Sequence, residues 1–153
     1  MAVNDNYRLD NQAAIPSPFN ETLPAFFRAW DNPESKDEDW LHFFSPECAV
    51  KFGGHAMRAG FINAVKGPVV DLQHNLKTCW MPAGGLDGGT EAFIIQSSIW
   101  YRLIDGRKID ADCTSYIKLT PKGQGSWVAI EHEVFMSSFH IMDAVNGLTA
   151  GGT

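Results

Sequence analysis

The hydrophobic pattern of this chain changes once, near Leu72, and that change constrains the fold more than any other feature. Before it, apolar residues recur at helical spacing in short segments. After it come long runs rich in Ile, Val, Thr, Tyr, Phe and Trp, the residues that strands favour. Helices followed by an uninterrupted set of strands indicate an α+β fold with an antiparallel sheet.

Three short helices are expected in the first part of the chain. The apolar residues of Leu23–Trp30 share one helical face, and Thr22 can cap that helix. The segment Ser35–Glu38 has the pattern of a capping box and precedes a second apolar stretch. A short strand at Ala49–Phe52 and a third helix around Phe61–Val65 should follow. These helices are expected to pack on the sheet.

Four long strands are expected after Leu72. They are Leu72–Met81, Ala92–Ile104, Lys108–Leu119 and Ser126–Ser138. Strands of this length exceed the usual five or six residues, so the sheet should curve strongly and form a cone-shaped pocket with the helices. We expect a single domain over residues 18–143, with a flexible N-terminal segment at 1–17 and a flexible C-terminal tail at 144–153.

The amino-acid composition limits the binding partners and the cellular location that we expect for this protein. The 153 residues are 44% hydrophobic, enough for one sizeable core. A formal net charge of −6 disfavours nucleic acid and anionic membrane surfaces. The start is polar and no apolar run could span a bilayer, so we expect a cytoplasmic protein. Cys48, Cys79 and Cys113 are widely spaced, and we expect them to act as small hydrophobic residues.

The order of these elements resembles the cone-shaped fold of the nuclear transport factor 2-like superfamily, shared by ketosteroid isomerase, the SnoaL-like polyketide cyclases and scytalone dehydratase. The resemblance runs from Thr22 to Met142. Its closest local similarity is to scytalone dehydratase, at Trp30-Asp31 after the first helix and at Gln73-His74, where that family has a pocket-facing histidine.

The resemblance also has limits that bear on the substrate. Two tyrosines of scytalone dehydratase are replaced here by Trp30 and by the segment Val50–Phe52. It therefore implies a relative that acts on another compound: a SnoaL-like cyclase, isomerase or dehydratase of secondary metabolism that needs no cofactor. A homodimer or homotrimer is expected.

His74 is the first catalytic candidate. Strand alternation places it with Leu76, Thr78 and Trp80 on the more apolar face, the expected pocket side. Because the ordinary pKa of histidine is about 6.5, such a residue can act as general acid or base near neutral pH. The alternative is a buried core histidine satisfied by one hydrogen bond.

Asp110 and His132 are the other catalytic candidates. Acidic residues inside a strand are uncommon, so Asp110 and Asp112 either line the solvated face or enter the pocket, where Asp110 would orient His74. His132 lies in an otherwise apolar row that includes Ile130 and Val134 and should face inward. It is either a structural residue or a second acid–base group. His74, Asp110 and His132 lie on separate strands without a metal-binding motif, so we expect no metal.

The remaining candidates would bind the substrate. They are Trp30, Asp31, Phe52, Arg58, Trp80, Tyr101, Asp112 and Tyr116. A phenol at Tyr101 or Tyr116 could donate a hydrogen bond to a carbonyl or a developing oxyanion. The functional hypothesis is acid–base proton transfer on a small, largely apolar polycyclic molecule; the alternative is a non-catalytic ligand-binding or assembly domain of the same fold.

Overall fold

The computed structural model describes residues 6–52, 55–57, 68–82, 89–123, 125–136 and 147. In chain order the elements are η1 (Gln12–Ala14), α1 (Phe19–Asp31), α2 (Asp37–Leu41), β1 (Phe44–Phe52), β2 (His55–Met57), β3 (Val69–Trp80), β4 (Glu91–Leu103), β5 (Lys108–Pro121) and β6 (Trp127–Met136). The third helix expected near Phe61–Val65 lies outside the described residues, as does the C-terminal tail apart from residue 147.

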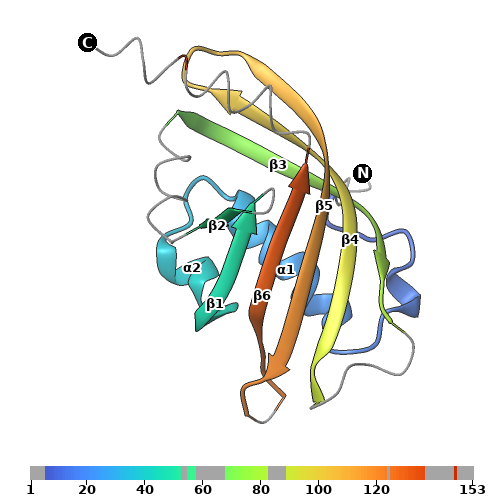
Figure 1. The fold of residues 1–153 in the computed structure, drawn as a ribbon. Coiled ribbons are helices and arrows are strands. Elements are labelled where there is room, and N and C mark those ends of the chain that lie inside the picture. Colours follow the sequence, from blue (N-terminus) through green and yellow to red (C-terminus); the bar gives the residue numbers. More distant parts are fainter. Residues whose placement is uncertain are drawn as a thin grey trace.

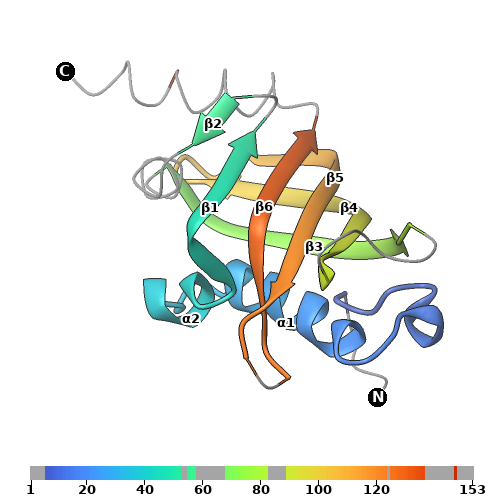
Figure 2. The same cartoon turned by 60° about the horizontal axis from the view of Figure 1, so that its bottom comes forward.

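The strands form one sheet in the order β2-β1-β6-β5-β4-β3 (Figure 1). Strands β3 to β6 form the antiparallel meander that the sequence predicts. Strand β1 extends this sheet by pairing in parallel with β6. Helices α1 and α2 lie on the concave side of the curved sheet (Figures 1 and 2). The predicted α+β fold is therefore confirmed.

A β-bulge in β3 changes which residues face the helices. The register between β3 and β4 shifts between Leu76 and Thr78, and such a shift bends the strand and reverses its alternation. His74 and Leu76 are buried before the bulge and Cys79 is buried after it. Trp80 is therefore 49% exposed, which corrects its expected place beside His74.

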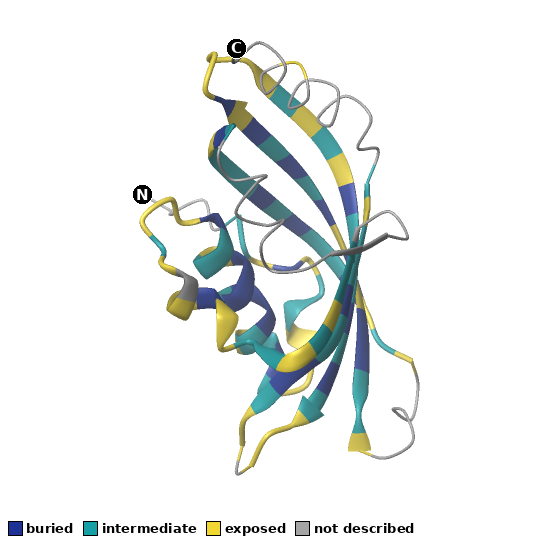
Figure 3. Cartoon of the chain, turned by 60° about the vertical axis from the view of Figure 1, so that its left-hand side comes forward, coloured by how far each residue is buried: buried dark blue, intermediate teal, exposed yellow. Residues whose placement is uncertain are grey.

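Most of the core lies between α1 and the sheet. Leu23, Phe26 and Phe27 are buried on the inner face of α1 and pack against residues such as Phe93 and Ile95 of β4. Burying side chains of this size contributes roughly 2 kcal/mol each. Figure 3 shows buried residues alternating with more exposed ones along the strands.

Helix α1 begins four residues earlier than predicted. Pro24 therefore lies inside the helix rather than in its first turn, where it has no N–H to donate to the Asn20 carbonyl. The side-chain amide of Gln12 donates to that carbonyl instead. Thr22 is not the cap; its hydroxyl donates to the Pro18 carbonyl at 3.0 Å.

Helix α2 is short and begins one residue later than predicted. The backbone N–H of Lys36 donates to the carboxylate of Asp39 at 2.8 Å, which replaces the expected pairing of Ser35 with Glu38. Strand β1 then begins at Phe44. No helix in the described ranges is long and apolar enough to cross a membrane.

The part of the N-terminal segment that the structure describes, residues 6–17, is held against β3. The backbone N–H of Leu76 donates to the Asn6 carbonyl at 2.8 Å, and that of Asp10 donates to the Lys77 carbonyl at 2.6 Å. Leu9 is 1% exposed and belongs to the main core. The polar composition predicts a flexible segment, but Leu9 and Ile15 are buried and anchor residues 6–17 on the core.

Candidate active site

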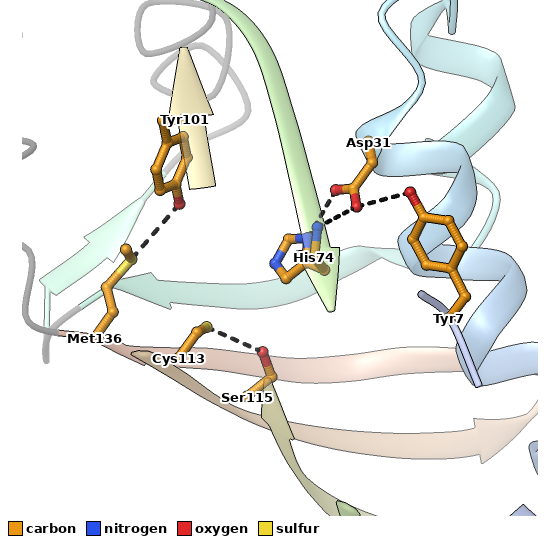
Figure 4. Close-up of polar contacts among 7 residues, drawn as sticks. All are labelled: Tyr7, Asp31, His74, Tyr101, Cys113, Ser115 and Met136. Atoms are coloured by element: carbon orange, nitrogen blue, oxygen red, sulfur yellow. Dashed lines mark hydrogen bonds and ion pairs between the residues drawn. The ribbon is translucent and has the colours of Figure 1, made fainter. Parts of the chain in front are cut away.

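A buried carboxylate–imidazole pair forms where the end of α1 meets β3. Asp31 is the last residue of α1, and His74 lies on β3. One carboxylate oxygen of Asp31 is 2.7 Å from Nδ1 of His74. Its other oxygen accepts the backbone N–H of His74 at 2.6 Å and the hydroxyl of Tyr7 at 3.0 Å (Figure 4). These contacts fix both the carboxylate and the imidazole ring.

The surroundings of His74 favour its protonated form. Burial by itself lowers the pKa of His74, but the hydrogen bond to Asp31 and the negative charge of that carboxylate, with a further contribution from the nearby Cys113, outweigh burial and raise the pKa to about 9. At neutral pH His74 therefore carries a proton next to the Asp31 carboxylate. A buried group with a proton to give is a candidate general acid.

His132 has the opposite tendency. It is 8% exposed on β6, and its ring centroid lies 5.7 Å from that of Phe26 and 5.8 Å from that of Phe44. Burial, and then repulsion from the charge of His74, lower the pKa of His132 to about 4. Its Nε2 atom is buried and has no hydrogen-bond partner among the described residues. His132 is therefore neutral at pH 7 and can accept or donate a hydrogen bond.

His132 lines a narrow cavity of about 20 Å³ between α1, the start of β1 and the last two strands. The walls are mainly apolar and include Phe26, Phe44 and Trp127. This volume suffices for about one water molecule. A small polar molecule in this cavity would lie beside His132.

Further along the concave face, Tyr101 and Cys113 lie on the other side of the His74 ring from Asp31 (Figure 4). The Tyr101 hydroxyl donates to the sulfur of Met136 at 3.7 Å. Burial raises the pKa of Tyr101 far above its ordinary value, so the phenol stays neutral and can donate a hydrogen bond. Cys113 is 3% exposed, and its Sγ lies 3.9 Å from the Ser115 hydroxyl oxygen.

The structure corrects the expected pairing of His74 with Asp110. The side chain of Asp110 is 75% exposed and faces Lys108 at 3.7 Å; that of Asp112 is 89% exposed and faces Lys77 at 3.7 Å. Both lie in the solvated row of β5, because the apolar alternate row faces the helices. The carboxylate that contacts His74 is Asp31, which the sequence suggested only as a substrate-binding residue.

The other expected substrate-binding residues are dispersed. Tyr116 lies in the same outward row as Asp110 and Asp112. Trp30 packs against Trp40, with ring centroids 4.9 Å apart. The Phe52 side chain and the whole of Arg58 lie outside the described residues. Among the described residues of this set, Asp31 and Tyr101 lie near His74 (Figure 4).

Sequence reasoning missed two residues of the site, Tyr7 and Cys113. Tyr7 lies in the segment that we expected to be flexible, although its alternation with Leu9 was a signal of an ordered, extended segment. Cys113 lies in the buried row of β5, where its sequence context predicts only a small hydrophobic residue. Within the described residues, no group of three His, Cys, Asp or Glu side chains could hold a metal ion.

Compared by sequence, the chain matches no family model, and no curated protein matches it. Solved structures do match. A hexachlorocyclohexane dehydrochlorinase (LinA) of type 2 has a TM-score of 0.65 at 9% identity, over 78% of this chain and 82% of the other. A provisionally assigned scytalone dehydratase from Novosphingobium aromaticivorans has a TM-score of 0.62 at 10% identity, over 76% and 79%.

A third structure is a nuclear transport factor 2-like protein from Salmonella enterica serovar Typhimurium, with a TM-score of 0.63 at 11% identity, over 75% of this chain and 85% of the other. At such low identity the agreement concerns the fold. The superfamily fold predicted from the order of elements is confirmed: the chain has the cone-shaped α+β fold of the nuclear transport factor 2-like proteins.

Proposed function

We propose that this protein is a cofactor-independent enzyme that catalyses an elimination or isomerisation by proton transfer. The observation that carries the proposal is the buried Asp31–His74 pair, which faces an otherwise largely apolar part of the sheet. Similarity to proteins named as a dehydrochlorinase and a dehydratase supports chemistry of this kind on this fold. This similarity supports the class of reaction and does not identify the substrate of this protein.

The opposite pKa shifts of the two histidines suggest which one acts as the acid and which as the base. Environments that push two pKa values apart separate an acid from a base. His74, with its pKa raised to about 9, would donate a proton to a carbonyl oxygen or leaving group. Neutral His132 would accept one. Tyr101 would donate a hydrogen bond to an oxygen on which negative charge develops.

The substrate proposed for this site is small, cyclic and largely apolar, as in secondary metabolism. The apolar residues beyond His74, including Ile99 and Leu103, support such a substrate. Cys48, Cys79 and Cys113 are all free thiols, which is compatible with a reducing compartment, so we place the enzyme in the cytoplasm.

Proton exchange tests this function without knowledge of the natural substrate. A panel of cyclic ketones, including cyclohexanone and 1-tetralone, would be incubated with the protein in D2O, and α-deuteration followed by NMR. We expect exchange above the buffer rate for at least one ketone. Asp31→Asn and His74→Ala should reduce it by about a hundredfold, a typical contribution of general acid–base catalysis.

Asp110→Asn is the matched control. It makes the same chemical change as Asp31→Asn, but on strand β5 and at a side chain that is 75% exposed. It should leave the exchange rate unchanged. Exchange that is equally fast in His74→Ala, or that never exceeds the buffer rate with any ketone, would contradict the proposed function.

A second candidate is a ligand carrier without catalysis. The apolar cluster formed by Val69, Ile99, Tyr101, Leu103 and Cys113 favours it, because such a surface binds an apolar ligand without any chemistry. Binding of 1-tetralone measured by calorimetry, without deuteration and unchanged in Asp31→Asn, would support the carrier over the enzyme.

A further inference from the structure

The imidazole of His74 contacts a second side chain of α1 besides Asp31. The centroid of the Phe27 ring lies 4.8 Å from the centroid of the imidazole, and the two ring planes are inclined at 58°. Phe27 and Asp31 are four residues apart on α1, a spacing that places both side chains on the same face of a helix. One helix therefore presents a carboxylate and an aromatic ring to the same imidazole.

The contact between Phe27 and His74 is shielded from water. Phe27 is 2% exposed and His74 is 6% exposed. The face of an aromatic ring attracts a cation within about 6 Å of its centroid, and the attraction is larger where water is excluded. Asp31 accepts a hydrogen bond from Nδ1 of His74 at 2.7 Å, so the charged imidazole is held beside the phenyl ring.

Phe26, the preceding residue of α1, contacts the other buried histidine. Its ring centroid lies 5.7 Å from that of His132, with the two planes at 81°. Such an edge-to-face arrangement is common between neutral aromatic rings, and His132 is the histidine whose pKa is lowered to about 4. Two neighbouring phenylalanines therefore contact one charged and one neutral histidine, which makes Phe26 a matched control for Phe27.

The titratable groups around His74, within the described part of the chain, come from α1 and from the three strands after β3. They are Asp31 of α1, Tyr101 of β4, Cys113 of β5 and His132 of β6 (Figure 4). Phe27 differs from all of them because its side chain does not titrate. Its attraction for the imidazolium is therefore the same at every pH at which the protein is folded.

We propose that Phe27 is a positioning residue of the acid–base site, whose phenyl ring attracts the charged imidazole of His74 and holds it against Asp31. The inference rests on the proposed function, in which His74 donates a proton. Phe27 does not touch that proton but determines how firmly His74 holds it. Loss of the attraction would favour the neutral imidazole and leave fewer molecules with a proton to donate above pH 7.

Stepwise fluorination of the Phe27 ring tests the contact with little change of shape. Phe27 would be replaced by 4-fluoro-, 3,5-difluoro- and 3,4,5-trifluorophenylalanine, because fluorine withdraws negative charge from the ring face. NMR titration of the His74 ring protons, assigned by comparison with His74→Gln, should show a pKa that falls stepwise, by about 1 in total. The same series at Phe26 should leave the His74 pKa unchanged, since that ring contacts His132.

The pH dependence of ketone deuteration provides a second measurement. The deuteration rate, corrected for buffer catalysis, should fall as His74 loses its proton. This fall should occur about one pH unit lower in Phe27→Leu than in wild type. Circular dichroism would establish that Phe27→Leu is folded, and the trifluorinated variant takes its place if it is not.

The two measurements separate the contact from the reaction. A His74 pKa that stays constant or rises with fluorination of Phe27, or that falls equally with fluorination of Phe26, would overturn the role of Phe27 even if deuteration is fast. A stepwise fall of the pKa without deuteration of any ketone would support the contact between Phe27 and His74 and reject the proposed function.

Discussion

At the scale of single residues, Asp31 determines the state of the site because both of its carboxylate oxygens are occupied. It accepts hydrogen bonds from the Tyr7 hydroxyl and from two nitrogens of His74. Hydrogen bonds to a charged group are about twice as strong as neutral ones. Asp31 thereby holds the backbone and the ring of His74 with one side chain.

Tyr7 should act as a positioning residue for this carboxylate. Tyr7→Phe removes one donor, so more of the negative charge of Asp31 acts on the imidazolium and the pKa of His74 should rise further, as measured by NMR titration of the ring protons. Ketone deuteration should fall about tenfold, with a loss of stability of about 1 kcal/mol. Arg28→Ala removes the cation 5.1 Å from the Tyr7 ring but keeps the hydroxyl, and should leave the His74 pKa unchanged. An unshifted pKa in Tyr7→Phe would refute the positioning role.

His132 should make the fold sensitive to mild acid. Its pKa falls from 6.5 in the unfolded chain to about 4 in the fold, so its neutral form is preferred and its contribution is lost as pH falls from 6.5 towards 4. Urea unfolding should show wild type losing stability between pH 6.5 and 5, and His132→Phe losing less. Identical slopes in the two proteins would contradict the assigned shift.

His74 should make the stability of the fold sensitive to alkaline pH. Because its pKa is raised to about 9, its stabilising contribution is complete below pH 6.5 and is lost as pH rises through about 9. Urea unfolding between pH 6.5 and 9 should therefore show wild type losing stability, and His74→Gln losing less. A wild-type stability that is flat over this range would argue against the ion pair.

At the scale of elements, strands were easier to predict than the contacts between elements. Strands β3 to β6 follow from long runs of β-favouring residues, a local property. The Asp31–His74 bond joins residues 43 positions apart, and no local pattern marks where the end of α1 meets β3. The bulge after Leu76 likewise has no sequence signature, and it turns Trp80 outward.

The N-terminal segment should contribute as much stability as an internal element. Leu9 is 1% exposed, so Leu9→Ala leaves a cavity and should lower the free energy of unfolding by about 3 kcal/mol, measured by urea denaturation. Ile104→Ala removes a side chain that is 68% exposed and should cost less than about 1 kcal/mol. Equal effects of the two substitutions would show that residues 6–17 do not fold with the core.

At the scale of the whole molecule, the convex face of the sheet carries several exposed apolar side chains among the described residues. Trp80, Ile94 and Phe135 are 49%, 43% and 48% exposed. Trp80 pairs with Ile94 across β3 and β4, and Phe135 lies on β6 opposite Thr114. Large apolar side chains exposed on one face of a sheet are typical of an interaction surface.

We propose that this face joins copies of the chain into a homodimer or homotrimer. Analytical ultracentrifugation should find an oligomer for wild type and a shift towards monomer for Ile94→Asp and Phe135→Asp, because a charge placed in an apolar contact must be desolvated. Ile104→Asp, at the turn after β4, should keep the wild-type mass. A monomeric wild type would exclude this assembly.

The attachment of residues 6–10 to Leu76 and Lys77 has a further consequence for solubility. Strand β3 is at the edge of the sheet, and an open edge offers backbone groups to strands of other molecules. The segment that carries Tyr7 to Asp31 also occupies part of that edge. Detachment of these few residues would therefore misalign the acid–base pair and open a template for aggregation in the same event, so that inactivation and precipitation would occur together.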